Sequence, residues 1–222
     1  MAENYPAEKL LFKVIDDLRD FLPHLVLVGG WVPYLYTQYI WRQEFDGTKL
    51  GAGALYPTTV ITTTDMDFGV TLGSYTGNES IADHVRKLGY GERHVSMDRP
   101  TPFVPIVTGK DGQEKAEVEF ITVLNPPKFV HEKLVGKEIK LNNVQDFEIL
   151  LESPSIFTLT THKVQIPEAA TFMFHKLLTF VLREYEDKQR KDLYYVYYML
   201  PFSPNSILLD DNMQHNHEIE IA

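Results

Sequence analysis

Two aspartates in the segment Thr-Thr-Asp-Met-Asp-Phe-Gly-Val, residues 63–70, are suited to metal chemistry. The segment is expected to form a strand, and residues two apart on a strand share a face. The carboxylates of Asp65 and Asp67 would then point the same way and repel each other, which a divalent cation relieves. Mg²⁺ takes oxygen ligands and keeps places for water and substrate phosphates. The pair therefore predicts a magnesium site, which Mn²⁺ would also fit.

A glycine pair stands where a phosphate group could approach the main chain. Gly29 and Gly30 follow the apolar run Leu-Val-Leu-Val at 25–28 and precede an expected helix at 31–41. Glycine lets a ligand come close to the backbone, and the N–H groups at a helix start favour phosphate. We expect a phosphate-binding turn beside the metal site. The alternative is a turn with no binding role.

A third carboxylate is expected from a β-hairpin. Residues 103–107 and 115–123 are apolar runs that flank Gly109-Lys110-Asp111-Gly112, and Asp-Gly is a strong turn signal. In the second run Ala116, Val118 and Phe120 would face one side and Glu117, Glu119 and Ile121 the other. Either glutamate could complete a two-metal site, in which metals activate the attacking oxygen and stabilise the leaving pyrophosphate. The alternative is that these acids, and those at 65 and 67, are ordinary solvent-facing strand residues.

The elements that position these residues are mixed α/β first and helical afterwards. Apolar spacing predicts a helix at 7–21, and residues 42–60 are expected to be a loop. Further predicted elements are a helix at 79–88, strands at 91–97, 156–160 and 162–166, a helix beginning at Pro167 and a helix at 191–200. We therefore expect a core at 1–165, a helical lobe at 166–203 and a flexible tail at 204–222.

Composition excludes several classes of function. The 222 residues include no cysteine, so disulfides, thiolate zinc sites and cysteine nucleophiles are ruled out. A net charge of −10 disfavours a broad nucleic-acid surface. The first residues do not form a secretory signal, and no run is long and apolar enough to span a membrane. We expect a cytoplasmic protein.

Three segments in this order resemble the nucleotidyltransferase superfamily built on the polymerase-beta-like core: Leu-Val-Gly-Gly-Trp at 27–31, residues 63–70, and Glu-Val-Glu-Phe-Ile at 117–121. Residues 175–184 and 190–200 resemble the helical part of the AbiEii/MenT-like bacterial toxin nucleotidyltransferases. The resemblance implies an α+β fold, a mixed sheet with helices on one side, and a C-terminal helical lobe. Two features depart from the family: a longer gap between Gly30 and Asp65, and Glu in place of Asp as the third acid.

The resemblance also implies a role for each candidate residue. Gly29 and Gly30 would bind the triphosphate, with help from the Thr64 hydroxyl, and Asp65 and Asp67 would ligate the metals. Glu119 would complete the site and assist deprotonation of the acceptor, and it is preferred to Glu117 because two apolar residues follow it.

The helical segments supply three further candidates. Lys176 and Arg183, seven apart on one predicted helix face, would reach the phosphates, and Asp192 would orient Lys176 or contact the nucleotide. Two alternatives need no chemistry: a structural Lys176–Asp192 ion pair, and Arg183 as a complement to the helix dipole.

The leading hypothesis is an enzyme that transfers a nucleoside monophosphate from an NTP to a hydroxyl or phosphate acceptor. The acceptor would be tRNA, a protein or a small molecule, and the most specific version is a toxin with a cognate antitoxin. The alternatives are a non-catalytic nucleotide-binding module, a partner-binding protein and a metal phosphohydrolase.

Overall fold

The computed structural model describes residues 6–40, 63–93, 100–108, 112–152, 154–159 and 161–202. The predicted loop at 42–60 and tail at 204–222 lie outside these residues. Contacts divide the chain into two units, Met1–Val32 with Ile61–Pro167 and Pro33–Val60 with Glu168–Ala222. We call them the sheet unit and the helical unit and describe each by itself.

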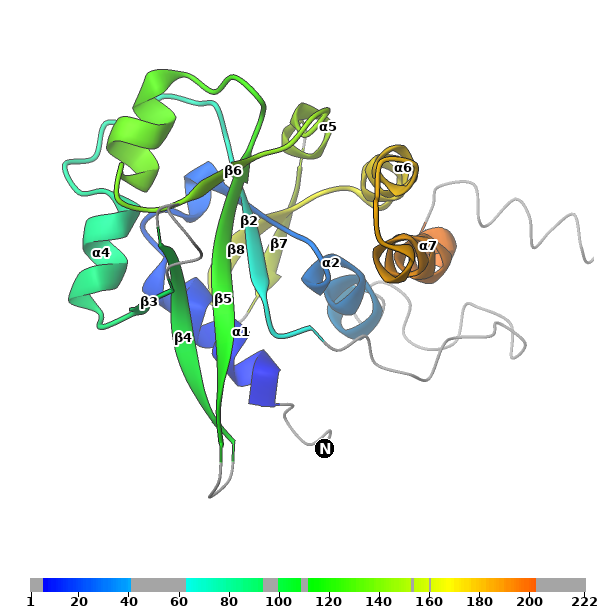
Figure 1. Cartoon of the computed structure of the whole chain (residues 1–222), viewed down its shortest axis with the longest axis horizontal. Coiled ribbons are helices and arrows are strands. Elements are labelled where there is room, and N and C mark those ends of the chain that lie inside the picture. Colours follow the sequence, from blue (N-terminus) through cyan, green and yellow to red (C-terminus); the bar gives the residue numbers. More distant parts are fainter. Residues whose placement is uncertain are drawn as a thin grey trace, which may run out of the picture. The chain divides into compact units, whose positions relative to one another are not determined.

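The sheet unit is organised around one mixed β-sheet (Figure 1). Within the described residues the sheet has eight strands in the order β3-β4-β5-β2-β1-β8-β7, with β6 paired to β5. The strands are β1 Leu25–Val28, β2 Met66–Val70, β3 Gly91–Arg93, β4 Thr101–Thr108, β5 Gly112–Thr122, β6 Leu141–Asn143, β7 Ser155–Leu159 and β8 His162–Ile166. Pairing is antiparallel for β1–β2 and parallel for β2–β5. The predicted α+β class with a mixed sheet is confirmed.

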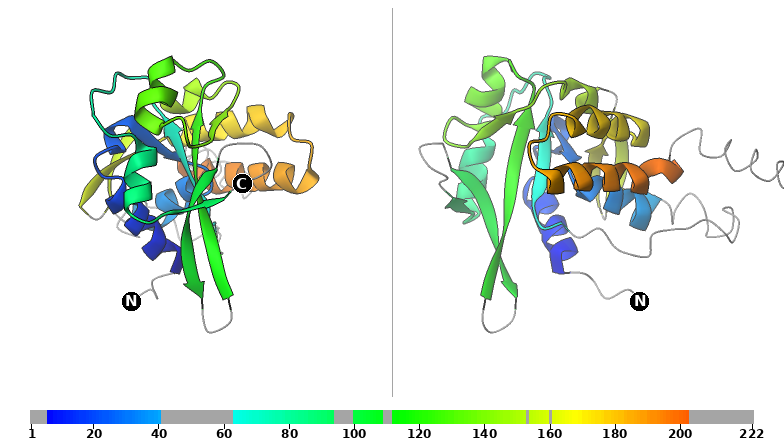
Figure 2. Two further views of the ribbon diagram at one scale, coloured as in Figure 1. Left: turned by 60° about the vertical axis from the view of Figure 1, so that its left-hand side comes forward. Right: turned by 45° about the vertical axis from the view of Figure 1, so that its right-hand side comes forward.

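The predicted hairpin is the longest pair of strands. β4 and β5 run antiparallel from Phe103 opposite Glu117 to Thr108 opposite Gly112 (Figure 2). The C-terminal half of β5 then pairs with β2 and β6, so one strand serves both the hairpin and the centre of the sheet. The predicted alternation is also confirmed, because Ala116, Val118 and Phe120 are buried and Glu117, Glu119 and Ile121 only partly so.

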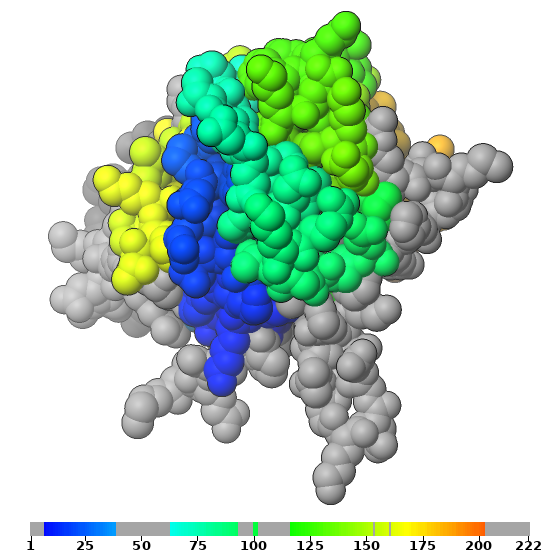
Figure 3. Space-filling model, turned by 90° about the vertical axis from the view of Figure 1, so that its left-hand side faces the viewer, coloured from blue at the N-terminus to red at the C-terminus, as the bar shows by residue number. Residues whose placement is uncertain are grey.

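One face of the sheet is covered by helices α1 (Pro6–Asp17) and α4 (Ile81–Lys87), as Figure 3 shows. Side chains of the central strands on this face have no exposed surface: Met66, Phe68, Val70, Val118 and Phe120. Helix α1 buries its own apolar residues at helical spacing, Leu11, Val14, Ile15 and Leu18. Both helices are shorter than predicted. This apolar layer anchors β2 and β5 and leaves their alternate residues for the other face.

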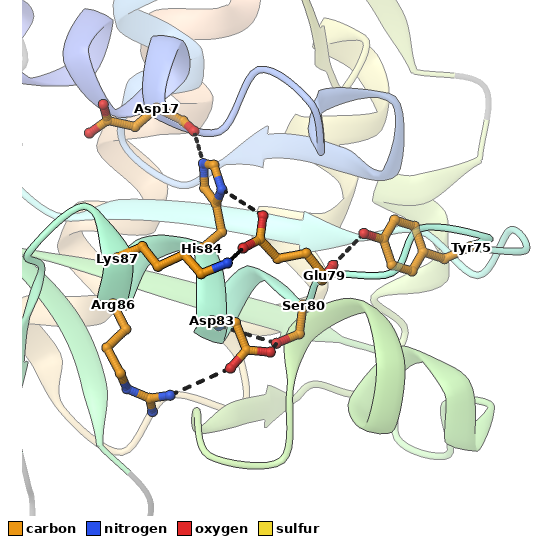
Figure 4. Close-up of polar contacts among 8 residues, drawn as sticks. All are labelled: Asp17, Tyr75, Glu79, Ser80, Asp83, His84, Arg86 and Lys87. Carbon is orange, nitrogen blue, oxygen red and sulfur yellow. Dashed lines mark hydrogen bonds and ion pairs between the residues drawn. The ribbon is translucent and has the colours of Figure 1, made fainter.

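A polar network fixes α4 to the end of α1 (Figure 4). The His84 ring bonds to the main-chain oxygen of Asp17 through Nε2 at 2.7 Å and to Glu79 Oε2 through Nδ1 at 3.2 Å. Hydrogen bonds from Lys87 and then from His84 hold the pKa of Glu79 below its usual value. Ser80 caps α4 by accepting from the Asp83 N–H at 3.2 Å. These contacts keep the helix layer in place behind the sheet.

The opposite face is only partly covered. Helix α5 (Glu148–Leu151) packs there in an apolar cluster of Val26, Val28, Phe147 and Leu150, bordered by Ile121, Val144 and Leu151. A Cβ built on Gly69 would lie 2.9 Å from Leu151 Cδ2, so the missing side chain lets α5 sit close to β2. Beyond α5 this face carries Asp67 of β2 and Glu117 and Glu119 of β5.

The described part of the helical unit, residues 33–40 and 168–202, contains a helix pair. Helices α6 (Ala169–Phe180) and α7 (Glu186–Met199) pack against each other, and 3-10 helix η4 (Leu200–Phe202) follows. The C-terminal helical region was predicted, but α7 begins before residue 191. The predicted helix at 31–41 is a short α2 (Trp31–Leu35) continued by the π-helix η2 (Tyr36–Ile40).

Two shorter elements complete the list: 3-10 helix η1 (Leu22–His24) and π-helix η3 (Val130–Val135). No helix among the described residues is long and apolar enough to cross a membrane.

Candidate active site

Four carboxylates gather on the partly covered face of the sheet. The parallel register of β2 and β5 sets Asp67 beside Glu119 and Met66 beside Val118. One residue earlier the same register sets Asp65 beside Glu117, whose main-chain N–H donates to Asp65 Oδ1 at 3.4 Å. We call Asp65, Asp67, Glu117 and Glu119 the acidic block. Both glutamates that the sequence offered therefore lie beside the aspartates.

The glycine turn after β1 touches this block. Asp67 is paired with Val28 of β1, and Gly29 follows directly with a φ of 71°. A Cβ built on Gly29 would lie 2.0 Å from Asp67 Oδ2, so the carboxylate occupies the space of a side chain. Only glycine allows both this conformation and this approach. Gly30 is buried in the same turn, ahead of α2.

Glu119 has a partner that sequence reasoning missed. Its Oε2 accepts a hydrogen bond of 3.1 Å from Asn142 Nδ2 on β6. Nothing in the local sequence singles out Asn142, because its place follows from the pairing of β6 with β5, where it stands beside Ile121. Thr64, the remaining candidate of the sheet unit, is half-buried directly before Asp65.

The acidic block fits a magnesium ion in its donor chemistry. All of its side-chain donors are carboxylate oxygens, the ligands that Mg²⁺ prefers. Among the described residues, no three His, Asp or Glu side chains are arranged to hold a metal ion as they stand. Mg²⁺ usually takes one or two carboxylates and completes its shell with water and phosphate oxygens. Asp65 and Asp67 match that demand without a third protein ligand already in place.

The helical unit holds the other three candidates in one ion cluster. Asp192, 4% exposed in its side chain, contacts Lys176 Nζ at 3.1 Å and Arg183 Nε at 2.9 Å. Lys176 Nζ also lies over the rings of Phe172 and Tyr195, at 5.6 and 5.5 Å from their centroids. The ion pair between Lys176 of α6 and Asp192 of α7, one of the alternatives drawn from the sequence, is therefore present.

The helix face predicted for Lys176 and Arg183 needs a correction. Helix α6 ends at Phe180, so Arg183 lies beyond it and reaches Asp192 from the α6–α7 turn. Gln189 Nε2 donates to the main-chain oxygen of Arg183 at 2.9 Å and holds that turn. Arg183 therefore lies three residues after the C-terminal end of α6 and not on its face.

Comparison with known proteins identifies the family and a similar fold. No curated protein matches the sequence. The fold is similar to the crystal structure of an antigenic nucleotidyltransferase-like protein from Paracoccidioides brasiliensis, with a TM-score of 0.54 and 11% sequence identity over 89% of this chain and 77% of that chain. A family model described as nucleotidyltransferase matches residues 12–202, which include both units' candidate residues. Fold and family together support a nucleotidyl-transfer activity, and the chain belongs to this nucleotidyltransferase family.

Proposed function

We propose that this protein is a Mg²⁺-dependent enzyme that moves a nucleoside monophosphate from an NTP to a hydroxyl or phosphate acceptor. The observation that carries the proposal is the contact between Asp67 and Gly29, with Glu119 beside Asp67 in the sheet. A phosphate held at the glycine turn would lie next to the carboxylates. Mg²⁺ there would neutralise phosphate charge and make the acceptor oxygen a better nucleophile.

The residues of the sheet unit have distinct proposed tasks. Asp65 and Asp67 hold the metal, and Glu119 completes the metal site. The turn at Gly29 and Gly30 binds the triphosphate together with the Thr64 hydroxyl. The acceptor oxygen forms a bond to the α-phosphorus while the bond from that phosphorus to the bridging oxygen breaks. Pyrophosphate leaves with the bonding electrons, and Glu119 takes the acceptor's proton. Positioning and charge neutralisation supply the catalysis.

The ion cluster of the helical unit has a supporting task in this proposal. Lys176 and Arg183 carry positive charge suited to phosphate oxygens. Asp192 holds both cations at 3.1 and 2.9 Å, and so limits where their remaining N–H groups can point. Its role is to orient them.

The acceptor is proposed only by class: tRNA, a protein or a small molecule. The net charge of −10 favours an acceptor that does not need a broad cationic surface. One specific form of the proposal is a toxin restrained by an antitoxin. A small neighbouring gene whose product suppresses the toxicity of this chain would support that form.

The test combines turnover with binding. Purified protein is incubated with Mg²⁺ and each α-labelled NTP, with total RNA and with protein as acceptors, and pyrophosphate and labelled product are measured. Asp65→Asn with Asp67→Asn should abolish both, whereas Asp16→Asn, a matched loss of an exposed carboxylate, should not. Orthophosphate in place of pyrophosphate would identify a phosphohydrolase and contradict the proposal.

A non-catalytic nucleotide-binding module on the same fold is the second candidate. It is favoured by two departures from the family pattern, the longer gap between Gly30 and Asp65 and the glutamate in place of aspartate as the third acid. Calorimetry with ATP, CTP, GTP and UTP in the presence of Mg²⁺ separates the two. Tight binding without pyrophosphate release from any of the four would support the module.

A further inference from the structure

The Glu119 carboxylate is held by a residue outside the acidic block. Asn142 Nδ2 donates to Glu119 Oε2 at 3.1 Å. Since an ionised carboxylate only accepts hydrogen bonds, the amide must present its nitrogen here. The contact is partly buried, so water competes with it less than at an exposed site.

The position of Asn142 follows from the parallel pairing of β6 with β5. Asn142 stands beside Ile121, and Glu119 lies two residues before Ile121 on the same face. The Asn142 side chain is thus a diagonal neighbour of Glu119. On the other side of Glu119, Asp67 of β2 is paired with it in register. Glu119 has an acid on one side and an amide on the other.

Strand β6 is itself fastened to β5. The Val144 N–H donates to the Thr122 oxygen at 2.9 Å, and Asn143 Nδ2 donates to the Leu124 oxygen at 3.0 Å. The chain then enters the turn to Phe147 and α5, which pack in the apolar cluster on the same face of the sheet. Asn142 therefore projects from a fixed support.

The neutral amide of Asn142 affects Glu119 differently from a cationic side chain. Lysine or arginine beside Glu119 would neutralise it and compete with a divalent ion, whereas asparagine orients the carboxylate and leaves its charge. The bond occupies one lone pair of Oε2 and fixes the carboxylate plane, which leaves the other lone pairs of the carboxylate for metal or acceptor.

We infer that Asn142 is a positioning residue that orients the Glu119 carboxylate for the metal-dependent transfer. The inference rests on the proposed function and adds a residue to its site. Partners of this kind, one step outside the ligands, change metal affinity by about 10- to 100-fold when removed.

The experiment measures Mn²⁺ binding by electron paramagnetic resonance, with and without ATP, CTP, GTP and UTP, beside steady-state turnover. Asn142→Ala is expected to weaken Mn²⁺ binding about 10-fold and to lower kcat with little change in the KM for NTP. Asn142→Gln, which keeps an amide donor, should recover part of the loss. Asn125→Ala, which removes an exposed asparagine amide just after β5, is the matched control and should behave as wild type.

A double-mutant cycle shows whether Asn142 acts through Glu119. In a Glu119→Ala background, Asn142→Ala should cause no further loss of Mn²⁺ affinity. An equal loss in both backgrounds, or Mn²⁺ affinity and kcat of Asn142→Ala within twofold of wild type, would overturn the inference while the function stands. Absence of Mn²⁺ binding and turnover in wild type would overturn the proposed function as well, and so the two failures are distinguishable.

Discussion

At the scale of single residues, the contact between Gly29 and Asp67 connects the glycine turn with the acids. The glycine has a left-handed backbone, and its missing side chain leaves room for the carboxylate of the aspartate. The backbone conformation and the space are separate requirements, and Gly89 shares the left-handed backbone of Gly29 but not its close contact.

Gly29→Ala should abolish Mn²⁺ binding and turnover, because the new Cβ would stand 2.0 Å from Asp67 Oδ2 and displace it. The left-handed backbone should add a loss of about 1–2 kcal/mol in unfolding free energy. Gly89→Ala is the control, since Gly89 has a φ of 79° with no atom within 4 Å of a built Cβ. It should lose similar stability and keep activity. Full activity of Gly29→Ala would contradict the placement of the phosphate site.

A buried aspartate is the second feature at this scale. Asp192 holds two cations, and removing one partner of a buried ion pair leaves an uncompensated charge. Asp192→Ala should therefore reduce the urea unfolding free energy by about 3 kcal/mol.

Two comparisons make that prediction specific. Lys176→Met keeps most of the stem over the aromatic rings and leaves Arg183 paired with Asp192. It should therefore reduce the unfolding free energy less than Asp192→Ala does. Asp187→Asn, an exposed change in the first turn of the same helix, should reduce the unfolding free energy by less than about 1 kcal/mol. Unchanged stability with lost NTP affinity in Asp192→Ala would show instead that Asp192 contacts the nucleotide.

At the scale of elements, β1 and β2 depend on the short segment that leads into them. The 3-10 helix η1 ends at His24, whose main-chain oxygen accepts from the Thr71 N–H at 3.0 Å just after β2. The His24 ring meets the Tyr75 ring edge-on, with centroids 5.3 Å apart. Burial lowers the pKa of His24 below its ordinary 6.5, so the folded chain favours the neutral ring.

Stability should accordingly fall as the pH is lowered through the ordinary histidine range. Near pH 6.5 the unfolded chain binds the proton more readily than the folded one, so this contribution is present above pH 6.5 and is lost below it. His24→Phe, which keeps a ring against Tyr75, should show a smaller decrease between pH 7.5 and pH 5.5 in urea titrations. Equal slopes for the two proteins would contradict the assignment.

At the scale of the whole molecule, the candidate residues belong to both the sheet unit and the helical unit. The family match spans both units. Ligand binding that uses the acidic block should stabilise the sheet unit by mass action. The gain is about 2.7 kcal/mol when the ligand is at 100 times its Kd.

Thermal unfolding should therefore shift upward with Mn²⁺ and the preferred NTP together, and the shift should disappear after EDTA treatment. Asp65→Asn with Asp67→Asn should unfold near the wild-type temperature without ligand and show no shift with it. A shift that persists in this variant would place the metal elsewhere.

The sequence alone determined much of this protein. Local patterns predicted the helix of α1, the β4–β5 hairpin with its alternating faces, the strand that carries Asp67 and the helical C-terminal region. These features follow from apolar periodicity and turn residues within short stretches of sequence, because residues close in sequence are also close in space there. Asp65, Asp67 and the glycine pair were candidates on the same grounds, and their roles stay predictions.

Only the tertiary structure decided what lies beside what. The parallel pairing of β2 with β5 joins residues that are far apart in sequence and puts both Glu117 and Glu119 next to the aspartates. The same holds for Asn142 beside Glu119, for Asp67 against Gly29, and for Arg183 reaching Asp192 from a turn. Strand register and helix ends are set by burying whole apolar faces together, and no short stretch of sequence contains that information.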